Sequence, residues 1–150
     1  RGVSVVNGEV SYDAVIDNAA VFSAFMFGLF AADSHEVTAS IKTVSEVFNT
    51  SSEKPGLPRY ENDPYRRSKS EVSGNWWYIT TLWQAQYDIE NGNTDAAKNI
   101  ITWIQSHMLS TGMMGEQIDP VTNEMIAPAP LTWSHAEYLS TLIDLLGQER

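Results

Sequence analysis

The sequence contains no cysteine among its 150 residues. That absence excludes disulfide bonds, thiolate metal sites and a cysteine nucleophile. Basic residues are also few, with 9 Lys and Arg against 19 Asp and Glu, which gives a net charge of −10. Because so acidic a surface repels nucleic-acid backbones and anionic membranes, neither is expected as a partner.

Long apolar runs are missing as well. The longest, from Ala19 to Ala32, has about 14 residues and is interrupted by Ser23, whereas a bilayer span needs roughly 20. The chain begins with Arg1 instead of Met and shows no basic region followed by an apolar one, as a signal peptide would. We therefore expect an excised or processed piece of a protein, with a cytoplasmic location that also suits the lack of cysteine.

Histidine is scarce, with three residues in the chain. None stands in a nucleophile motif, no pair has the i, i+4 spacing of a zinc site, and no acidic loop has calcium-binding spacing. We expect neither a metal nor another cofactor. His35 and His107 fall at predicted helix ends, and for His135 a packing or capping role is favoured over a functional one.

Helical spacing of apolar residues indicates an all-α chain without strands. Ser134 and Glu137 have the spacing of a capping box, and the apolar run of the first helix predicts burial on most sides. Connections between the helices are alternately short and long, as in an α/α toroid whose long loops build a site on one rim. The five predicted helices span about 13–30, 35–48, 76–90, 95–108 and 134–146.

Glu116 is the acid most open to a catalytic interpretation. It lies in a loop after Gly115. Its position is therefore set by turns of the backbone and does not follow from the amphipathic pattern of a helix. Structural and catalytic roles both remain open for it. Trp77 and Trp133, near predicted helix starts, are either core residues or platforms for the faces of sugar rings.

Arg59 lies in the long irregular segment 49–74, whose length indicates function or disorder. Its guanidinium either pairs with Glu61 or Asp63 as a structural bridge or presents its donors to sugar hydroxyls.

Taken in order, several short motifs resemble the glucoamylase family, glycoside hydrolase family 15, in its bacterial and archaeal branch. The resemblance covers nearly the whole chain and is most specific in the Arg-Tyr-x-x-Asp loop, the Gly-Asn-x-Trp segment, the Glu-Gln dipeptide and Leu-Thr-Trp-Ser. The motifs are Tyr12-Asp13-Ala14, Leu57-Pro58-Arg59-Tyr60-Glu61-Asn62-Asp63-Pro64-Tyr65, Gly74-Asn75-Trp76-Trp77, Gly115-Glu116-Gln117 and Pro130-Leu131-Thr132-Trp133-Ser134-His135-Ala136.

The resemblance implies an (α/α)6 barrel that hydrolyses α-glucosidic bonds with inversion. It makes Glu116 the general base, Arg59 a ligand of sugar hydroxyls and Asp63 the acid that orders the loop. The substrates it allows are α-glucan, α-1,6-linked oligosaccharides and trehalose. The substrate-binding residues it implies are Arg59, Tyr60, Asp63, Trp77 and Trp133.

Three departures from the family pattern stand out. Trp76 occupies the place of a proline, and the insert 66–73 is longer and more basic than usual. The family's general acid lies upstream in a Trp-Glu setting, and no such segment occurs here. We therefore expect residues 1–150 to be the C-terminal portion of the catalytic domain. The rest of that domain would be the partner, and the isolated chain would be inactive.

Two other interpretations stay open. In the first, the chain is a non-catalytic carbohydrate-binding or assembly module that contacts sugar without turnover. In the second, which leaves the ordered motifs unexplained, it is an all-α interaction protein.

Overall fold

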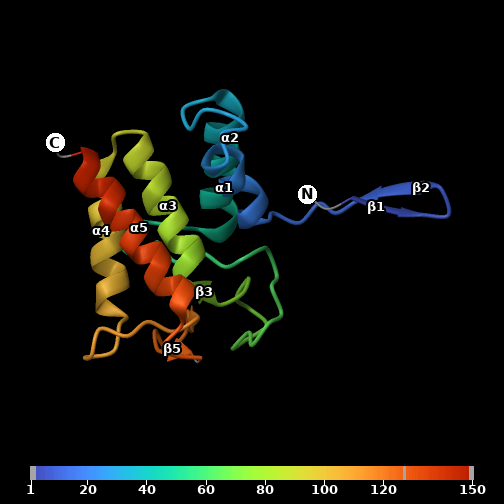
Figure 1. The fold of residues 1–150 in the computed structure, drawn as a ribbon. Helices are drawn as coiled ribbons and strands as arrows, with labels where there is room; N and C mark the ends of the chain where they lie inside the picture. Colours follow the sequence, from blue (N-terminus) through green and yellow to red (C-terminus); the bar gives the residue numbers. More distant parts are fainter. Residues whose placement is uncertain (1–2, 127, 149–150) are drawn as a thin grey trace.

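The computed structural model describes residues 3–126 and 128–148. It confirms the all-α class, since helices form the body of the protein (Figure 1). The helices are α1 (Asn18–Met26), α2 (His35–Phe48), α3 (Tyr78–Glu90), α4 (Thr94–Ser106) and α5 (Thr132–Gln148).

Short strands are also present, so the expectation of a chain without strands is wrong. A hairpin of β1 (Val3–Val6) and β2 (Glu9–Tyr12) stands away from the helices (Figure 1). A second sheet has the order β3 (Trp76–Trp77), β4 (Gln117–Ile118) and β5 (Met125–Ile126), all antiparallel. Strands of two residues contain too little alternation to be recognised in a sequence.

The central helix is α3, which packs against α1, α4 and α5. One side of it joins the apolar cluster of Tyr78, Leu82 and Ile104 that continues into α4 and α5. On its other side, Trp83 and Tyr87 pack against the cluster around Phe22 that joins α1 and α2. Because α3 is covered on both sides, its N-terminus has a fixed position relative to the loops that surround it.

The first helix is shorter and more exposed than its apolar run suggests. Asp17 caps it by accepting hydrogen bonds from the backbone N–H groups of Ala19 and Ala20, so it starts after the predicted position. Phe27 and Leu29 are 85% and 71% exposed. The prediction that this helix is buried on most sides is therefore wrong for the described chain.

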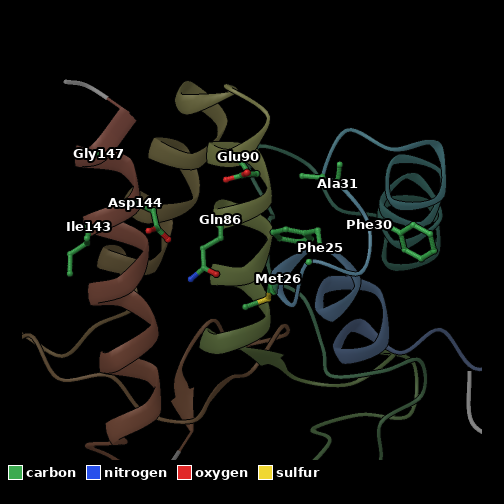
Figure 2. Close-up of a pocket in the computed structure, with 11 residues that line it drawn as sticks. Phe25, Met26, Phe30, Ala31, Gln86, Glu90, Ile143, Asp144 and Gly147 are labelled. Carbon is green, nitrogen blue, oxygen red and sulfur yellow. The ribbon is translucent and has the colours of Figure 1, made fainter.

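A groove of about 800 Å³ follows the exposed face of α3 between α1 and α5 (Figure 2). Gln86 and Glu90 of α3 face it, with Met26 on the α1 side and Ile143 on the α5 side. Ile143 and its neighbours Leu139 and Leu146 on α5 are also exposed. Exposed apolar side chains that gather on one face in this way are typical of a face that another part of a protein covers.

No helix in the described part of the chain is long and apolar enough to cross a membrane.

Asp88 is a buried acid of α3 whose ionisation lowers the stability of the folded chain. Burial raises its pKa to about 6 from the ordinary 3.8, although the side chains of Gln84 and Asn93 donate hydrogen bonds to it. Since the folded state disfavours its ionisation, the cost is absent below about pH 4 and grows as the pH rises through 6. We therefore expect Asp88→Asn to raise the free energy of unfolding at pH 7.5 by about 2 kcal/mol.

Urea denaturation of the chain at pH 7.5 and pH 4 tests this expectation, and the gain should disappear at the lower pH. Asp95→Asn is the matched control, because Asp95 is an exposed acid in the first turn of α4. The same gain at both pH values would contradict the assignment of the cost to ionisation.

Candidate active site

The loop that follows Pro58 is ordered by one ion pair. Arg59 donates from Nε to Oδ2 of Asp63 at 2.7 Å and from Nη2 to Oδ1 at 2.8 Å. Asp63 is 1% exposed and also accepts a hydrogen bond from the backbone N–H of Tyr65. This arrangement fits the loop-ordering role expected for Asp63 and matches the structural-bridge interpretation of Arg59.

The charges of this pair support each other. Desolvation raises the pKa of Asp63, but the hydrogen bonds from Arg59 and Tyr65 outweigh it, so the net pKa is lowered. The hydrogen bonds to Asp63 raise the pKa of Arg59, against desolvation, and the charge of Glu116 adds to the rise. Arg59 and Glu116 are therefore within electrostatic range of each other.

Aromatic rings surround the guanidinium of Arg59. Its central carbon lies 4.5 Å from the ring centre of Trp77, 5.1 Å from that of Tyr65 and 5.4 Å from that of Tyr60. The ring of Trp77 lies 6.0 Å from Tyr65 and 6.2 Å from Trp133, measured between centroids. The structure thus brings together all the predicted sugar-binding residues, and it adds Tyr65.

The two tryptophans differ in burial. Trp133 is 48% exposed, whereas Trp77 is buried, and its indole Nε1 has no hydrogen-bond partner among residues 3–126 and 128–148. An unpaired buried N–H costs free energy unless a partner is supplied. Trp133 therefore offers an exposed ring, and Trp77 an unused donor beside Arg59.

Glu116 is placed by a segment that the start of α5 clamps. Leu131 N–H donates to the carbonyl of Met114, Met114 N–H donates to Nε2 of His135, and Ser134 Oγ donates to the carbonyl of Gly115. These three hydrogen bonds fix the two residues that precede Glu116.

The carboxylate of Glu116 is held by a relay of amides. Gln117 donates from Nε2 to Oε2 of Glu116 at 2.9 Å and accepts at Oε1 from Nδ2 of Asn75 at 2.8 Å. Asn75 also donates to the carbonyl of Arg66 at 2.7 Å, which fastens the start of the basic insert. Gln117 and Asn75 are both buried. The position of Glu116 is thus tied to that of the insert.

Asn18, at the start of α1, anchors the Arg59 loop from the other side. Its Nδ2 donates to the carbonyl of Pro58 at 2.6 Å and its backbone N–H to that of Arg59 at 2.9 Å. No sequence signal pointed to Asn18, which lies within an ordinary helical pattern. For Asn75 and Gln117 the signal was their place within the Gly-Asn-x-Trp and Glu-Gln motifs.

Ser134 and the histidines have structural roles in the fold. Ser134 does not form the predicted capping box, because its hydroxyl bonds to Gly115 and Glu137 accepts from Gln86 of α3. His135 accepts from Met114, as favoured, and His107 ends α4. The described residues contain no cluster of acids or histidines able to hold a metal ion.

Gly115 allows the Glu116 segment to lie close to β5. A Cβ atom there would lie 2.9 Å from Cγ of Met125 and 3.0 Å from the carbonyl oxygen of Ile126. We expect Gly115→Ala to displace the segment and lower the free energy of unfolding by about 1–3 kcal/mol, as overpacking does. Thermal unfolding measures this.

Gly147→Ala is the control for that substitution. Gly147 lies in α5 with open space around the added Cβ, so the change should stabilise the chain by about 0.5–1 kcal/mol. A Gly115→Ala variant as stable as the unmodified chain would show that the segment tolerates a shift.

Comparison with known proteins finds glycoside hydrolases. The family model for glycosyl hydrolases family 15 matches residues 84–143, a range that includes Glu116 and Trp133. An uncharacterized glycosyl hydrolase of Methanocaldococcus jannaschii, MJ1610, is 24% identical over 140 residues, covering 85% of this chain and 21% of that protein. A bacterial glucoamylase complexed with acarbose has the same fold, with a TM-score of 0.77 at 24% identity. The match to the family model covers 60 of the 150 residues, and over this stretch the chain is similar to glycosyl hydrolase family 15.

The chain spans only part of the length of these relatives. The structural match to the glucoamylase includes 98% of this chain but 23% of the glucoamylase chain. A glycosidase in complex with glucose gives a TM-score of 0.74 at 20% identity, covering 97% of this chain and 40% of that one.

Proposed function

We propose that this chain is the part of an inverting α-glucoside hydrolase that supplies the general base, Glu116, and one wall of the sugar pocket. The observation that supports this most is the Glu116 carboxylate, which Gln117 holds within electrostatic range of Arg59, whose guanidinium lies among aromatic rings. The match of residues 84–143 to the model of glycosyl hydrolases family 15 supports the reaction class.

In the proposed reaction, Glu116 takes a proton from a water molecule. The water oxygen forms a bond to the anomeric carbon while the glycosidic bond breaks, and a general acid gives a proton to the leaving oxygen. Inverting enzymes hold their two carboxyl groups about 6.5–9.5 Å apart to make room for that water. Asp63 cannot serve as the acid, because its carboxylate is buried against Arg59. We assign the general acid to the rest of the enzyme.

Binding would use the groups around Arg59. The hydrogen bonds to Asp63 engage Nε and Nη2, which leaves Nη1 to donate to sugar hydroxyls. Trp133 presents an exposed ring to a sugar face, while the buried ring of Trp77 lies against the guanidinium of Arg59 and helps to hold it in place. Because the comparison structures hold acarbose and glucose, we propose an α-linked gluco-oligosaccharide as substrate, with α-1,4 and α-1,6 glucans and trehalose as the candidates.

Sugar binding without turnover is the second candidate for the isolated chain, since its site contains one available carboxylate. We expect this chain to release no glucose from maltose, isomaltose or trehalose, and the complete enzyme to release β-glucose from one of them. Glucose release and the anomer first formed, followed by proton NMR, test both statements. Turnover by the isolated chain would contradict the assignment of the acid, and α-glucose as first product would contradict inversion.

A further inference from the structure

A second hollow lies on the opposite side of α3 from the groove of Figure 2, between α2 and α4. Its volume is about 440 Å³, within the range of about 300–1,000 Å³ that small-molecule sites occupy. Four parts of the chain contribute to it: α2, the segment 50–55, α3 and α4. The polar lining residues are Lys42, Ser45, Thr50, Ser51, Ser52, Gln84, Asp88 and Asn99.

The floor of this hollow contains a carboxyl group that the proposed reaction does not use. Asp88 is 9% exposed, and its side-chain donors are the neutral amides of Gln84 and Asn93. The bond from Gln84 is long, at 3.3 Å. A buried acid in a pocket, retained although burial opposes its ionisation, is a pattern found at functional sites.

The walls combine apolar and hydroxyl-bearing groups. Tyr87, Ile41 and Ile100 give apolar surface, while Ser45 and Asn99 offer hydrogen-bonding groups at the rim. A saccharide has the complementary surface, with C–H faces for the apolar wall and hydroxyl donors for a carboxylate. The net charge of −10 disfavours an anionic ligand.

The hollow is separate from the candidate active site. Trp77 precedes the first turn of α3, whereas Asp88 lies in its last turn, about 16 Å farther along the helix axis at 1.5 Å per residue. A single sugar ring cannot reach both.

We propose that the hollow between α2 and α4 is a second saccharide-binding site, in which Asp88 accepts hydrogen bonds from sugar hydroxyls. The site would hold an α-glucan to the protein outside the place of hydrolysis. It requires no turnover and no contribution from Glu116, so it goes beyond the proposed function.

Methyl and indole NMR of the chain during titration with maltose can separate the two sites. Ile41 and Ile100 line the hollow, whereas Ile118 pairs with Trp76, and Trp77 with Gln117, across β3 and β4 next to Glu116. We expect maltose to shift the signals of Ile41 and Ile100. Asp88→Asn should raise the Kd obtained from these shifts about tenfold, because a charged acceptor is lost. Asp95→Asn, the exposed-acid control, should leave that Kd unchanged.

Asn99→Trp provides a second variant that does not touch the core, because Asn99 is exposed on α4 at the rim. It should fill the hollow and abolish the shifts of Ile41 and Ile100. Shifts at Ile118 and Trp77 alone would overturn the second site while supporting the proposed function. The second site would also be overturned by shifts at Ile41 and Ile100 that survive both variants. Shifts there with calcium chloride but not with maltose would identify a cation site and overturn it equally.

Discussion

Glu116→Gln in the complete enzyme is expected to lower kcat by about 10²–10⁴-fold, the range that a positioned general base contributes. Glutamine has nearly the shape of glutamate, but its amide cannot take a proton from water. Maltose binding should persist, because the ligands proposed for the sugar are Arg59 and the surrounding rings and not Glu116. Glucose release under saturating substrate gives kcat, and calorimetry gives the Kd.

Glu124→Gln is the matched control for this variant. Glu124 is an exposed acid in the turn between β4 and β5, and its backbone makes the turn contacts. The substitution changes the charge by the same amount near the same sheet, so kcat should stay close to its normal value. A Glu116→Gln enzyme with near-normal kcat would remove Glu116 from the role of general base.

The parts of this site that could be predicted from the sequence are those within short motifs. Arg59 and Asp63 are four residues apart in one loop, so an ion pair between them was one of two open interpretations of Arg59. The structure shows this ion pair. Glu116 was singled out because it lies in a loop, between Gly115 and Gln117. The fold class and the approximate helix positions followed from apolar periodicity, which depends on local spacing alone.

The contacts between distant segments could not be predicted in this way. Ser134 and Glu137 have capping-box spacing, yet each side chain finds a partner elsewhere, in Gly115 and Gln86. Asn18 reaches the Arg59 loop across about 40 residues of sequence. The first helix was predicted too long because the apolar pattern continues past Phe27, which is exposed in the structure. In each case tertiary contacts, or their absence, decide the outcome and not local preference.

The Arg59–Asp63 pair leads to the second large expected effect. In Arg59→Ala, the buried carboxylate of Asp63 loses both guanidinium hydrogen bonds. Removing one partner of a buried pair costs several kcal/mol, and we expect about 2 kcal/mol here because the Arg59 side chain is 37% exposed and partly screened by solvent. The same variant should weaken maltose binding about tenfold or more, since charged donors to the sugar are lost.

A double variant separates the two roles of Arg59. In Arg59→Met with Asp63→Asn, no buried charge is left unpaired, so we expect most of the stability to return while maltose binding stays weak. The pH dependence gives a further check. The pKa of Asp63 is lowered by Arg59 and Tyr65 in the folded state. Its stabilising contribution is therefore present above about pH 4 and is lost as the pH falls through the folded pKa.

That acid-dependent loss should be absent from the double variant, and urea denaturation between pH 3 and pH 7 measures it. If maltose binding returned together with stability, Arg59 would be a loop-ordering residue with no sugar contact. If neither returned, the loop would need the ion pair itself to reach the Trp77 ring. Weak binding in a stable protein is the result expected of an arginine that both fixes its loop and presents its remaining donors to the substrate.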